Sequence, residues 1–344
     1  MVTMPGRNSI LRIQLMLARN VPIQNVHQRR WLGSVVLEPL KKRSVLSVQG
    51  SDAIPFMQGL ITNDMTHFAR GSNSIYAMFL NTSGRVMYDS LIYKSIRDPD
   101  EHFFIECDTS TVDQLAKHLN LFRVRKKVQI SKPDLQPWVA FTNRKESQDQ
   151  SLTAALTKGN IDGAFIYKDP RLEELGYRIL VGSSTGLDDL KAMFPVKTVF
   201  LENGSYVQHR YGLGIGEGVE NHPPGKCFPL ENNSDYLHGV SFHKGCYIGQ
   251  ELTARTHHTG VVRKRLMPLV FDQPVREGQF TSDAEIKTKD GQPVGKLRGY
   301  YQTVGIGLLR VEKVLSNQSL IVGDTVHCTT NKPDWWPTEQ PKKH

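Results

Sequence analysis

The sequence is organised around one stretch, Lys244-Gly245-Cys246-Tyr247-Ile248-Gly249-Gln250-Glu251. It sets a lone cysteine between two glycines, with a lysine before it and a carboxamide and a carboxylate after it. Glycines let another backbone or a ligand approach closely. A cysteine binds metal as the thiolate, a form that the charge of Lys244 favours and that of Glu251 opposes. An isolated cysteine is usually a buried packing residue, but this polar, glycine-flanked setting favours a functional thiol.

Length, composition and charge describe an ordinary globular protein. The chain has 344 residues, enough for two or three domains, and 39% of them are hydrophobic. The net charge of +9 by itself suggests an acidic partner, but residues 1–37 hold no Asp or Glu and five arginines, Arg7, Arg12, Arg19, Arg29 and Arg30. About +4 remains without them, so no nucleic-acid partner is predicted. No apolar run approaches the roughly 18 residues that a membrane span requires.

The N-terminal segment has the pattern of a mitochondrial transit peptide. On a helix, Ile10, Ile13 and Leu17 share one face, while Arg12 and Arg19 point nearly the opposite way. An amphipathic, arginine-bearing segment without acidic residues is typical of import signals. A secretory signal is excluded because the two arginines interrupt the apolar stretch, and the remaining alternative is a disordered segment or a surface helix. We therefore expect the protein in the mitochondrial matrix.

Cysteine spacing agrees with a reducing compartment. The chain has no Cys-x-x-Cys pair, so it contains neither a disulfide framework nor a self-sufficient zinc or iron–sulfur motif. Cys107 and Cys328 lie in strand-like runs and are interpreted as packing residues. Cys227 follows a proline- and glycine-containing loop and is a weaker second candidate for a functional thiol beside Cys246.

Residues 35–260 mix strands and helices, which predicts an α+β region of two lobes with no internal boundary fixed by the sequence. The predicted strands are Val45–Val48, Ile75–Leu80, Arg85–Tyr93, Phe103–Cys107, Trp138–Thr142 and Tyr177–Val181. The predicted helices are a run from Ser51-Asp52 to Leu60, a helix capped by Thr109 or Ser110, Leu187–Phe194 and Ser205–Tyr211.

The helix after Ser110 carries an apolar stripe and ends in a basic run. Val112, Leu115, Leu119 and Phe122 fall on one face and predict a core-facing side. Arg123–Lys127 then places four cations on five residues. A solvated edge is the simpler interpretation of this run, and a site for an anionic ligand tail is the sharper one.

The composition after residue 260 predicts a small all-β module, residues 261–330, followed by a tail, residues 331–344. Pro268 interrupts the run Val261–Phe271, which suits an edge strand. Asp290-Gly291 separates Ala284–Lys289 from Pro293–Leu297, which is a two-residue hairpin signal. Thr303–Val311 and Ser319–Val326 complete a series of short strands, most simply a small barrel or sandwich.

The motif around Cys246 resembles the signature of the folate-binding YgfZ-type proteins, relatives of the glycine-cleavage aminomethyltransferase (T-protein). The resemblance extends roughly from Val45 to Val326. Its further segments are Gly59-Leu60-Ile61-Thr62-Asn63-Asp64, Gly84-Arg85-Val86-Met87-Tyr88-Asp89, Arg210-Tyr211-Gly212-Leu213-Gly214, Phe228-Pro229-Leu230-Glu231, Gly295-Lys296-Leu297 and Gly305-Ile306-Gly307-Leu308-Leu309-Arg310.

The resemblance implies a three-domain α+β ring of mostly antiparallel sheets around a folate-sized pocket, with a C-terminal β-barrel. The mitochondrial branch of the family consists of iron–sulfur cluster assembly factors. The resemblance therefore implies a role in maturing four-iron, four-sulfur proteins together with A-type scaffold partners, by a chain that is monomeric on its own and has no turnover of its own. One position departs from the aminomethyltransferases: Gly176-Tyr177-Arg178-Ile179 carries Arg178 where they supply a glutamate to the pterin.

A single thiolate suits a shared cluster. Thiolates are preferred ligands of iron–sulfur clusters, but a two-iron cluster needs about four of them. We therefore expect a transient cluster held between Cys246 and thiolates of a partner scaffold, with Gly245 and Gly249 admitting its backbone and Lys244 and Arg255 offsetting the cluster's charge. Three histidines are candidate ligands or donors, although exposed loop histidines are commoner: His243, His257 and His258.

Two other functions stay open at the sequence level. A folate-dependent transferase would bind tetrahydrofolate, with Asp89 polarising a folate nitrogen and Arg123, Arg125 or Lys126 holding an acidic glutamyl tail. A cysteine hydrolase would use Cys246 as nucleophile and His257 or His258 as base. The residues predicted to bind a cluster or folate are Lys244, Gly245, Cys246, Tyr247, Gly249, Gln250, Glu251, Asp89 and Arg123.

Overall fold

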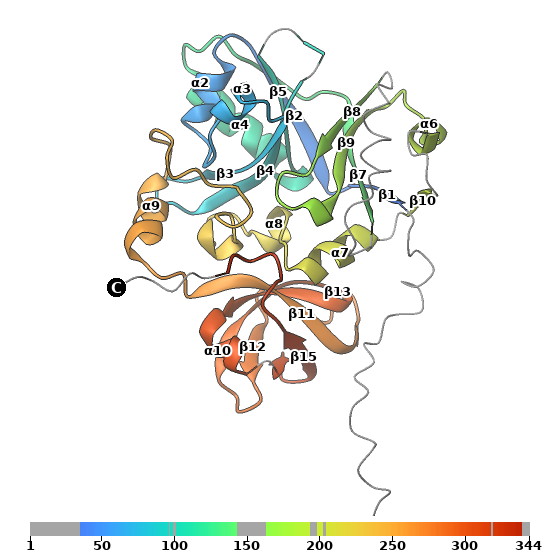
Figure 1. Cartoon of the computed structure of the whole chain (residues 1–344), viewed down its shortest axis with the longest axis vertical. Helices are drawn as coiled ribbons and strands as arrows, with labels where there is room; N and C mark the ends of the chain where they lie inside the picture. Colours follow the sequence, from blue (N-terminus) through green and yellow to red (C-terminus); the bar gives the residue numbers. More distant parts are fainter. Residues whose placement is uncertain are drawn as a thin grey trace, which may run out of the picture. The chain divides into compact units, whose positions relative to one another are not determined.

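The computed structural model describes residues 35–95, 97–98, 101–142, 163–192, 198–201, 204–317 and 319–338. The predicted transit peptide, residues 1–34, lies outside the described residues. Two five-stranded sheets and a closed barrel make up the described part (Figure 1). This arrangement confirms the predicted mixture of helices with mostly antiparallel sheets and a C-terminal β-barrel.

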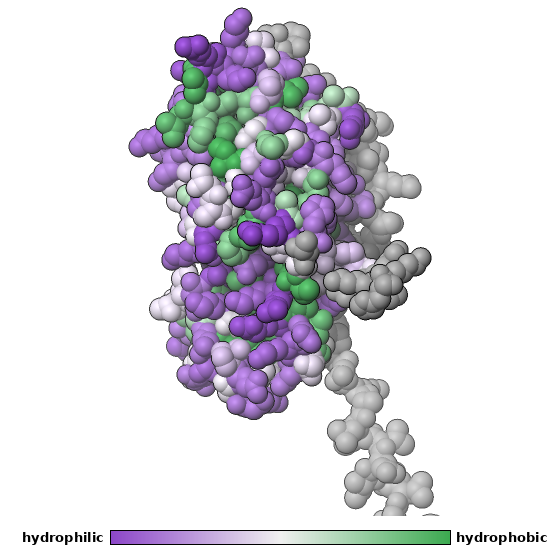
Figure 2. Space-filling view, turned by 90° about the vertical axis from the view of Figure 1, so that its left-hand side faces the viewer, coloured by the Kyte–Doolittle hydropathy of each residue, from purple (hydrophilic) through white to green (hydrophobic). Residues whose placement is uncertain are grey.

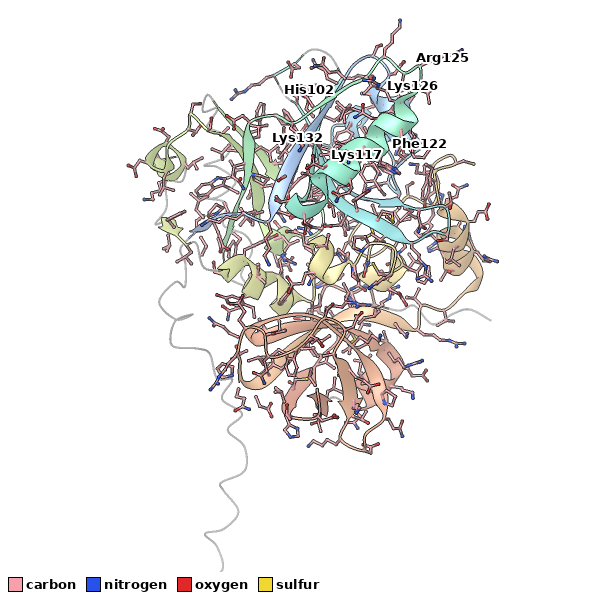
Figure 3. The ribbon with its side chains drawn as sticks, turned by 180° about the vertical axis from the view of Figure 1, so that it is seen from behind. His102, Lys117, Phe122, Arg125, Lys126 and Lys132 are labelled. Atoms are coloured by element: carbon pink, nitrogen blue, oxygen red, sulfur yellow. The ribbon has the colours of Figure 1, made fainter. Side chains whose placement is uncertain are left out.

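The first sheet has the order β3-β4-β5-β2-β6, and all its neighbours are antiparallel. Its strands are β2 (Arg43–Gln49), β3 (Ser74–Leu80), β4 (Val86–Lys94), β5 (His102–Asp108) and β6 (Gln129–Ser131). Its helices are α2 (Ala53–Gln58), α3 (Thr66–Ala69), the 3-10 turn η1 (Thr109–Thr111) and α4 (Val112–Arg123). Side chains of α2 and α4, such as Phe56 and Leu115, share a core with one face of this sheet. Figure 2 shows the side of the molecule on which α2, α4 and α9 lie, and Figure 3 shows α4 lying over the sheet.

The second sheet has the order β10-β1-β7-β9-β8, with one parallel pair, β1 with β10. Its strands are β1 (Val35–Pro39), β7 (Leu135–Thr142), β8 (Ala164–Lys168), β9 (Tyr177–Gly182) and β10 (Thr198–Phe200). The 3-10 turn η2 (Glu173–Leu175) and α6 (Leu187–Ala192) belong to the same region. One core joins the two sheets, because Met78 and Tyr93 of the first cluster with Phe141 and Leu180 of the second.

Short helices connect the sheets with the barrel. They are α7 (Ser205–Leu213), α8 (Gly218–Asn221) and the 3-10 turn η3 (Leu230–Asn232), and α7 and α8 contact barrel strand β13 (Figure 1). The barrel order is β11-β13-β12-β14-β15. Its elements are β11 (Lys264–Val275), β12 (Glu285–Thr288), β13 (Pro293–Arg310), α10 (Val311–Ser316), β14 (Ser319–Val322) and β15 (Val326–Thr330).

The barrel corrects three strand predictions. Strand β11 is not an edge strand, because it pairs with β13 on one side and with β15 on the other. Pro268 is accommodated because pairing with β15 begins only at Leu269. The two runs predicted as Pro293–Leu297 and Thr303–Val311 form the single strand β13, whereas Ser319–Val326 is split into the hairpin β14–β15.

Two details of α4 differ from the sequence expectation. Neither Thr109 nor Ser110 caps the segment; Asp108 does, since its carboxylate accepts a hydrogen bond from the Ser110 backbone N–H at 2.8 Å. Phe122, expected in the core, is 39% exposed, because α4 reaches past the edge of the hydrophobic core that buries Leu115 and Leu119.

Residues 331–338, expected as part of a tail, pack on the barrel. Trp336 is buried in the barrel core, and the indole N–H of Trp335 donates to the Leu213 carbonyl at 2.8 Å. Among the described residues, no helix combines the length and apolar character needed to cross a membrane.

Candidate functional site

Cys246 is the exposed cysteine of this chain. It lies in the loop that precedes α9 (Gln250–Thr259), whereas the other three cysteines are buried. Burial raises the pKa of Cys107 to about 12, that of Cys227 to about 11 and that of Cys328 to about 12. The prediction of Cys107 and Cys328 as packing residues is confirmed, and Cys227, the weaker candidate for a functional thiol, is buried like them.

Lys244 points away from solvent and anchors the loop. Its ammonium group donates to the carbonyl oxygens of Gln58 at 2.6 Å, Ile61 at 2.8 Å and Asn63 at 2.7 Å. These three bonds use all the donors that a lysine has. Burial lowers the pKa of Lys244 to about 8. The lysine therefore fastens the loop to the end of α2, and its charge is directed inward rather than toward Cys246 as the sequence suggested.

Gly249 meets a second motif glycine, Gly84, backbone against backbone. Gly249 has φ +76°, and a Cβ there would lie 2.2 Å from the Asn81 carbonyl oxygen and 3.1 Å from the Cα of Gly84. Gly84 has φ +75°, and its Cβ would lie 2.9 Å from the Gly249 carbonyl oxygen. Both positions therefore require glycine. This contact joins the β3–β4 turn to the start of α9.

The segment Gly59–Asp64 holds the other side of the same loop. The Ile248 N–H donates to the Gly59 carbonyl at 3.2 Å, and the Ser241 N–H donates to the Thr62 carbonyl at 3.0 Å. The Asn63 side-chain amide donates to the carbonyls of Tyr76 and His238, each at 2.7 Å. Sequence segments of the resemblance that are almost 200 positions apart thus combine to present one loop.

The remaining motif residues differ in their surroundings. Tyr247 packs against the core shared by the sheets, and its N–H donates to the Gln250 side-chain oxygen at 3.2 Å. Glu251 is exposed in the first turn of α9. A Cβ at Gly245 would meet no atom within 4 Å, so this glycine faces open space. The front of the loop is accessible, and its back is fixed.

Two of the nearby histidines make ring contacts: His257 stacks on Phe242 and meets His258 edge-on. The ring of His257 lies 3.5 Å from that of Phe242, with an interplanar angle of 10°, and 5.2 Å from that of His258. Burial lowers the pKa of His257, and His258 adds to this effect. His243 and Arg255 are exposed beside the loop and on α9. Within the described part of the chain, no three His, Cys, Asp or Glu residues are grouped as a metal site.

A second, buried group of charged residues lies between the sheets and contains Asp89 and Arg178. It balances four arginines with four carboxylates, and we call it the arginine–carboxylate cluster: Arg43, Arg171, Arg178, Arg210, Asp89, Glu106, Asp169 and Glu217. Arg178 donates to Glu106 at 3.0 Å and also to Asp169 and Glu217, with no exposed surface.

Like Arg178, Asp89 is paired with other protein groups. Arg43 donates to it at 3.2 Å and the Gly218 N–H at 3.1 Å. Burial by itself would raise the pKa of Asp89, but Arg43 and the other groups around it hold that pKa below its usual value. Sequence reasoning did not identify Arg43, Glu106, Asp169 or Glu217; their only signal was charge within runs otherwise read as strand or loop.

Comparison with known proteins places the chain in a family. It is 40% identical to the human protein "Iron-sulfur cluster assembly factor IBA57, mitochondrial" over 311 residues, which cover 87% of this chain and 85% of that protein. The corresponding mouse protein is 38% identical over 312 residues, with the same coverage of both chains. The *Dictyostelium discoideum* homologue is 31% identical over 310 residues, covering 83% of this chain and 74% of its own. The chain belongs to the IBA57 family.

Two further comparisons concern the fold of this IBA57 family member. The family model "CAF17, C-terminal beta-barrel domain" matches residues 263–338. The crystal structure of glycine cleavage system aminomethyltransferase T from *Bartonella henselae* superposes with a TM-score of 0.69 at 14% sequence identity, covering 90% of this chain and 88% of that one. The barrel and the aminomethyltransferase-like fold expected from the resemblance are therefore confirmed.

The residues assigned to folate do not come together in this IBA57 family member. Asp89 belongs to the face of the first sheet that is shared with the second sheet, like its neighbours Leu91 and Tyr93. Arg123 ends α4, which packs on the opposite face through Leu115. Arg178 and Asp89 are buried and already paired with protein groups. The arrangement does not fit a folate held by these groups.

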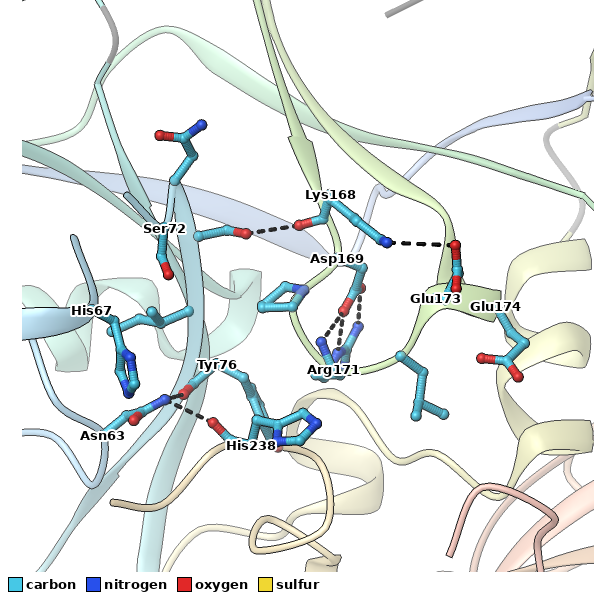
Figure 4. A pocket seen from close by; sticks show the side chains of 15 residues that line it. Asn63, His67, Ser72, Tyr76, Lys168, Asp169, Arg171, Glu173, Glu174 and His238 are labelled. Carbon is cyan, nitrogen blue, oxygen red and sulfur yellow. Dashed lines mark hydrogen bonds and ion pairs between the residues drawn. The ribbon is translucent and has the colours of Figure 1, made fainter. Parts of the chain in front are cut away.

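A pocket of about 610 Å³ lies near the cluster, between β3 and the loop after β8 (Figure 4). Arg171 and Asp169 are paired at its wall, and Asn63 and His238 form its other side. The Arg171 Nη1 and Tyr76 hydroxyl atoms are buried and have no hydrogen-bond partner among the described residues. These two atoms are therefore buried polar groups beside the pocket and are not part of its accessible surface.

Proposed function

We propose that this chain is a mitochondrial iron–sulfur cluster assembly factor in which Cys246 supplies one ligand to a cluster shared with an A-type scaffold. The observation that carries the proposal is the geometry of the Cys246 loop. It exposes this thiol in front and is fixed behind by Lys244 and Gly249. The names of the relatives support the assembly role and the compartment.

The loop suits a cluster that is completed by a partner. One thiolate leaves most ligand positions of a cluster open, and a partner can supply the rest. Gly245 leaves room for the partner's backbone beside Cys246. Helix α9 begins four residues after the cysteine, and a helix N-terminus favours a negatively charged group such as a thiolate-ligated cluster. Because Lys244 is directed inward, α9 and the exposed Arg255 replace it in offsetting that charge.

Fixation of the loop from behind has an energetic role. Binding a cluster between two proteins costs conformational freedom at the interface, and a preorganised loop reduces that cost. The three bonds of Lys244 and the Gly84–Gly249 contact hold the loop before a partner arrives. Under this proposal the motif contributes one reactive group, the thiol of Cys246, and its other residues position that thiol.

The test is anaerobic cluster reconstitution with an A-type scaffold, using the full chain and two variants. Wild type is expected to form a coloured complex, read by visible absorption and iron content, only in the mixture. Cys246→Ser removes the thiolate and is expected to abolish cluster retention in the complex. Glu312→Gln changes an exposed carboxylate of α10 in the barrel and is expected to retain the cluster. A fully loaded Cys246→Ser complex would overturn the proposal.

The physiological counterpart is the activity of four-iron, four-sulfur enzymes in mitochondria. We expect chains lacking Cys246 to leave these enzymes inactive while two-iron, two-sulfur proteins keep their clusters. Equal loss in both enzyme classes would contradict a role that is specific to four-iron, four-sulfur proteins.

A further inference from the structure

The C-terminal end of α4 exposes apolar side chains among cations. We call residues 121–127 the basic tip; they are Leu121, Phe122, Arg123, Val124, Arg125, Lys126 and Lys127. Leu121 is 73% exposed and Val124 is 81% exposed, and Phe122 joins them on the surface. Large apolar side chains so exposed and so close in sequence mark a binding surface rather than a core.

The backbone of the basic tip holds Val124 outward. Val124 has φ +43°, a conformation that a β-branched residue rarely adopts. The turn is closed by a hydrogen bond from the Lys126 N–H to the Arg123 carbonyl at 2.8 Å. The Lys127 N–H donates to the Asp52 carboxylate at 2.7 Å, and a Cβ at Gly50 would lie 2.2 Å from the Lys127 carbonyl oxygen. The protrusion is therefore tied to the start of α2 and is a built feature.

The charge around the basic tip has one sign. Residues 114–133 contain six lysines and arginines and no Asp or Glu. Two acidic side chains reach this region from outside the stretch: Asp113 pairs with Lys132, and Asp52 accepts from the Lys127 backbone. Figure 3 shows Arg125 and Lys126 beyond the end of α4, with Phe122 and Lys117 along the same helix. At the upper edge of Figure 2, hydrophobic surface lies directly beside strongly hydrophilic surface.

We propose that the basic tip binds the surface of an anionic lipid bilayer. In this arrangement Leu121, Phe122 and Val124 enter the interfacial layer, and Arg125 and Lys126 contact headgroup phosphates. Interfacial membrane sites combine protruding apolar side chains with flanking cations in this way. A purely electrostatic partner such as a polyanion uses the cations but gives no reason to hold Val124 outward in a strained conformation. The combination of both features favours the bilayer.

The experiment is vesicle sedimentation with the full chain, in a background where Arg7, Arg12, Arg19, Arg29 and Arg30 are glutamine. This background removes the N-terminal cations as a competing membrane contact. Binding is expected to vesicles that contain phosphatidylglycerol and not to vesicles of phosphatidylcholine alone. Arg125→Gln with Lys126→Gln is expected to lower the partition coefficient roughly twentyfold at low salt. The matched charge control, Lys289→Gln with Lys296→Gln on the barrel surface, is expected to leave it unchanged.

A second variant tests the apolar part without risk to the fold. Val124→Gly removes the exposed side chain and suits a positive φ, so the chain is expected to fold at least as stably as wild type. Its partition coefficient is expected to fall about threefold. Equal binding to both vesicle types, no binding to either, or full binding by the Arg125 and Lys126 double variant would overturn the proposal. Capture of an acidic protein or nucleic acid through the same cations, without vesicle binding, would overturn it too.

Discussion

The Cys246 loop and the arginine–carboxylate cluster use charged and polar residues in opposite ways. The loop turns Lys244 inward to three carbonyl oxygens and leaves Cys246 exposed. In the arginine–carboxylate cluster, Arg178 and Asp89 are hydrogen-bonded to other protein groups. The aminomethyltransferase-like fold is present, but Asp89, a candidate for polarising a folate nitrogen, and Arg178, which stands where the resemblance expects a glutamate, both pair with other protein groups. A matching fold therefore does not imply the same pocket chemistry.

The charged groups of the arginine–carboxylate cluster depend on one another because they are buried. Burial alone would raise the pKa of Asp169 and Glu217, but neighbouring guanidinium groups hold both below their usual values. The charges balance only while every partner is present. Desolvation makes such a network weak evidence of net stabilisation, yet removing one member leaves uncompensated charge behind. Single substitutions in the arginine–carboxylate cluster are therefore expected to destabilise the fold, whereas substitutions on the exposed side of the Cys246 loop are expected to be tolerated.

The largest expected effect follows from breaking the cluster. Arg178→Ala leaves Glu106, Asp169 and Glu217 short of a common partner in a buried site. We expect a loss of about 3–5 kcal/mol in the free energy of unfolding, the usual cost of an unpaired buried charge. Urea denaturation measures it. The control is Arg276→Ala, at an exposed arginine directly after β11, which should change the free energy of unfolding by less than about 0.5 kcal/mol.

The outcome separates structure from ligand binding. If Arg178 served a ligand rather than the fold, Arg178→Ala would unfold at the wild-type denaturant concentration. The variant would then lower only ligand binding, and Arg178 would not be a structural residue of the arginine–carboxylate cluster.

The next effect compares two glycines of one motif. Gly249→Ala forces a side chain into φ +76° and onto the Asn81 carbonyl oxygen, whereas Gly245→Ala meets open space. We expect Gly249→Ala to cost about 2 kcal/mol or more, from backbone strain and the displaced turn, and to lower cluster retention with the scaffold. Gly245→Ala is expected to stay within about 0.5 kcal/mol of wild type. Denaturation of both variants side by side decides; equal losses would show that the Gly84–Gly249 contact is not what fixes the loop.

Features that depend on neighbouring residues in the chain, such as turns and helix faces, could be predicted from the sequence. The stripe of Val112, Leu115 and Leu119 follows from helical periodicity and is confirmed. The hairpin around Asp290-Gly291 is also present, but its connection is longer than the predicted two residues, because β12 ends at Thr288 and β13 begins at Pro293. The sequence predicts two strands in place of β13, divided at residues 298–302, where Gly299 is a typical turn residue, although a strand bent around a barrel also uses glycine. Phe122 fitted the helical period but lies beyond the layer that covers α4.

The candidate site shows the same limit at longer range. The polar setting of Cys246 indicated an exposed thiol, and the structure exposes it. The direction of Lys244 was not predictable, because its acceptors lie more than 180 positions earlier in the chain. The partners of Arg178 were equally hidden, since Glu106 and Glu217 come from β5 and from the segment before α8. Pairings set by tertiary contacts leave no periodic trace in the sequence.

The smallest expected effect on stability belongs to Cys246 itself. Cys246→Ser changes an exposed side chain and is expected to alter the free energy of unfolding by less than about 0.5 kcal/mol. Cys107→Ser makes the same chemical change inside the core beside Leu115 and is expected to cost about 1–3 kcal/mol, because the hydroxyl is buried among apolar groups. Denaturation and cluster retention should therefore give opposite results for the two variants. Cys246→Ser is expected to keep the wild-type stability and lose the cluster. Cys107→Ser is expected to lose stability, while its folded fraction still retains the cluster. A Cys246→Ser chain that unfolded as readily as Cys107→Ser would mean that the thiol is part of the packing, and the distinction between an inward anchor and an outward ligand would have to be abandoned.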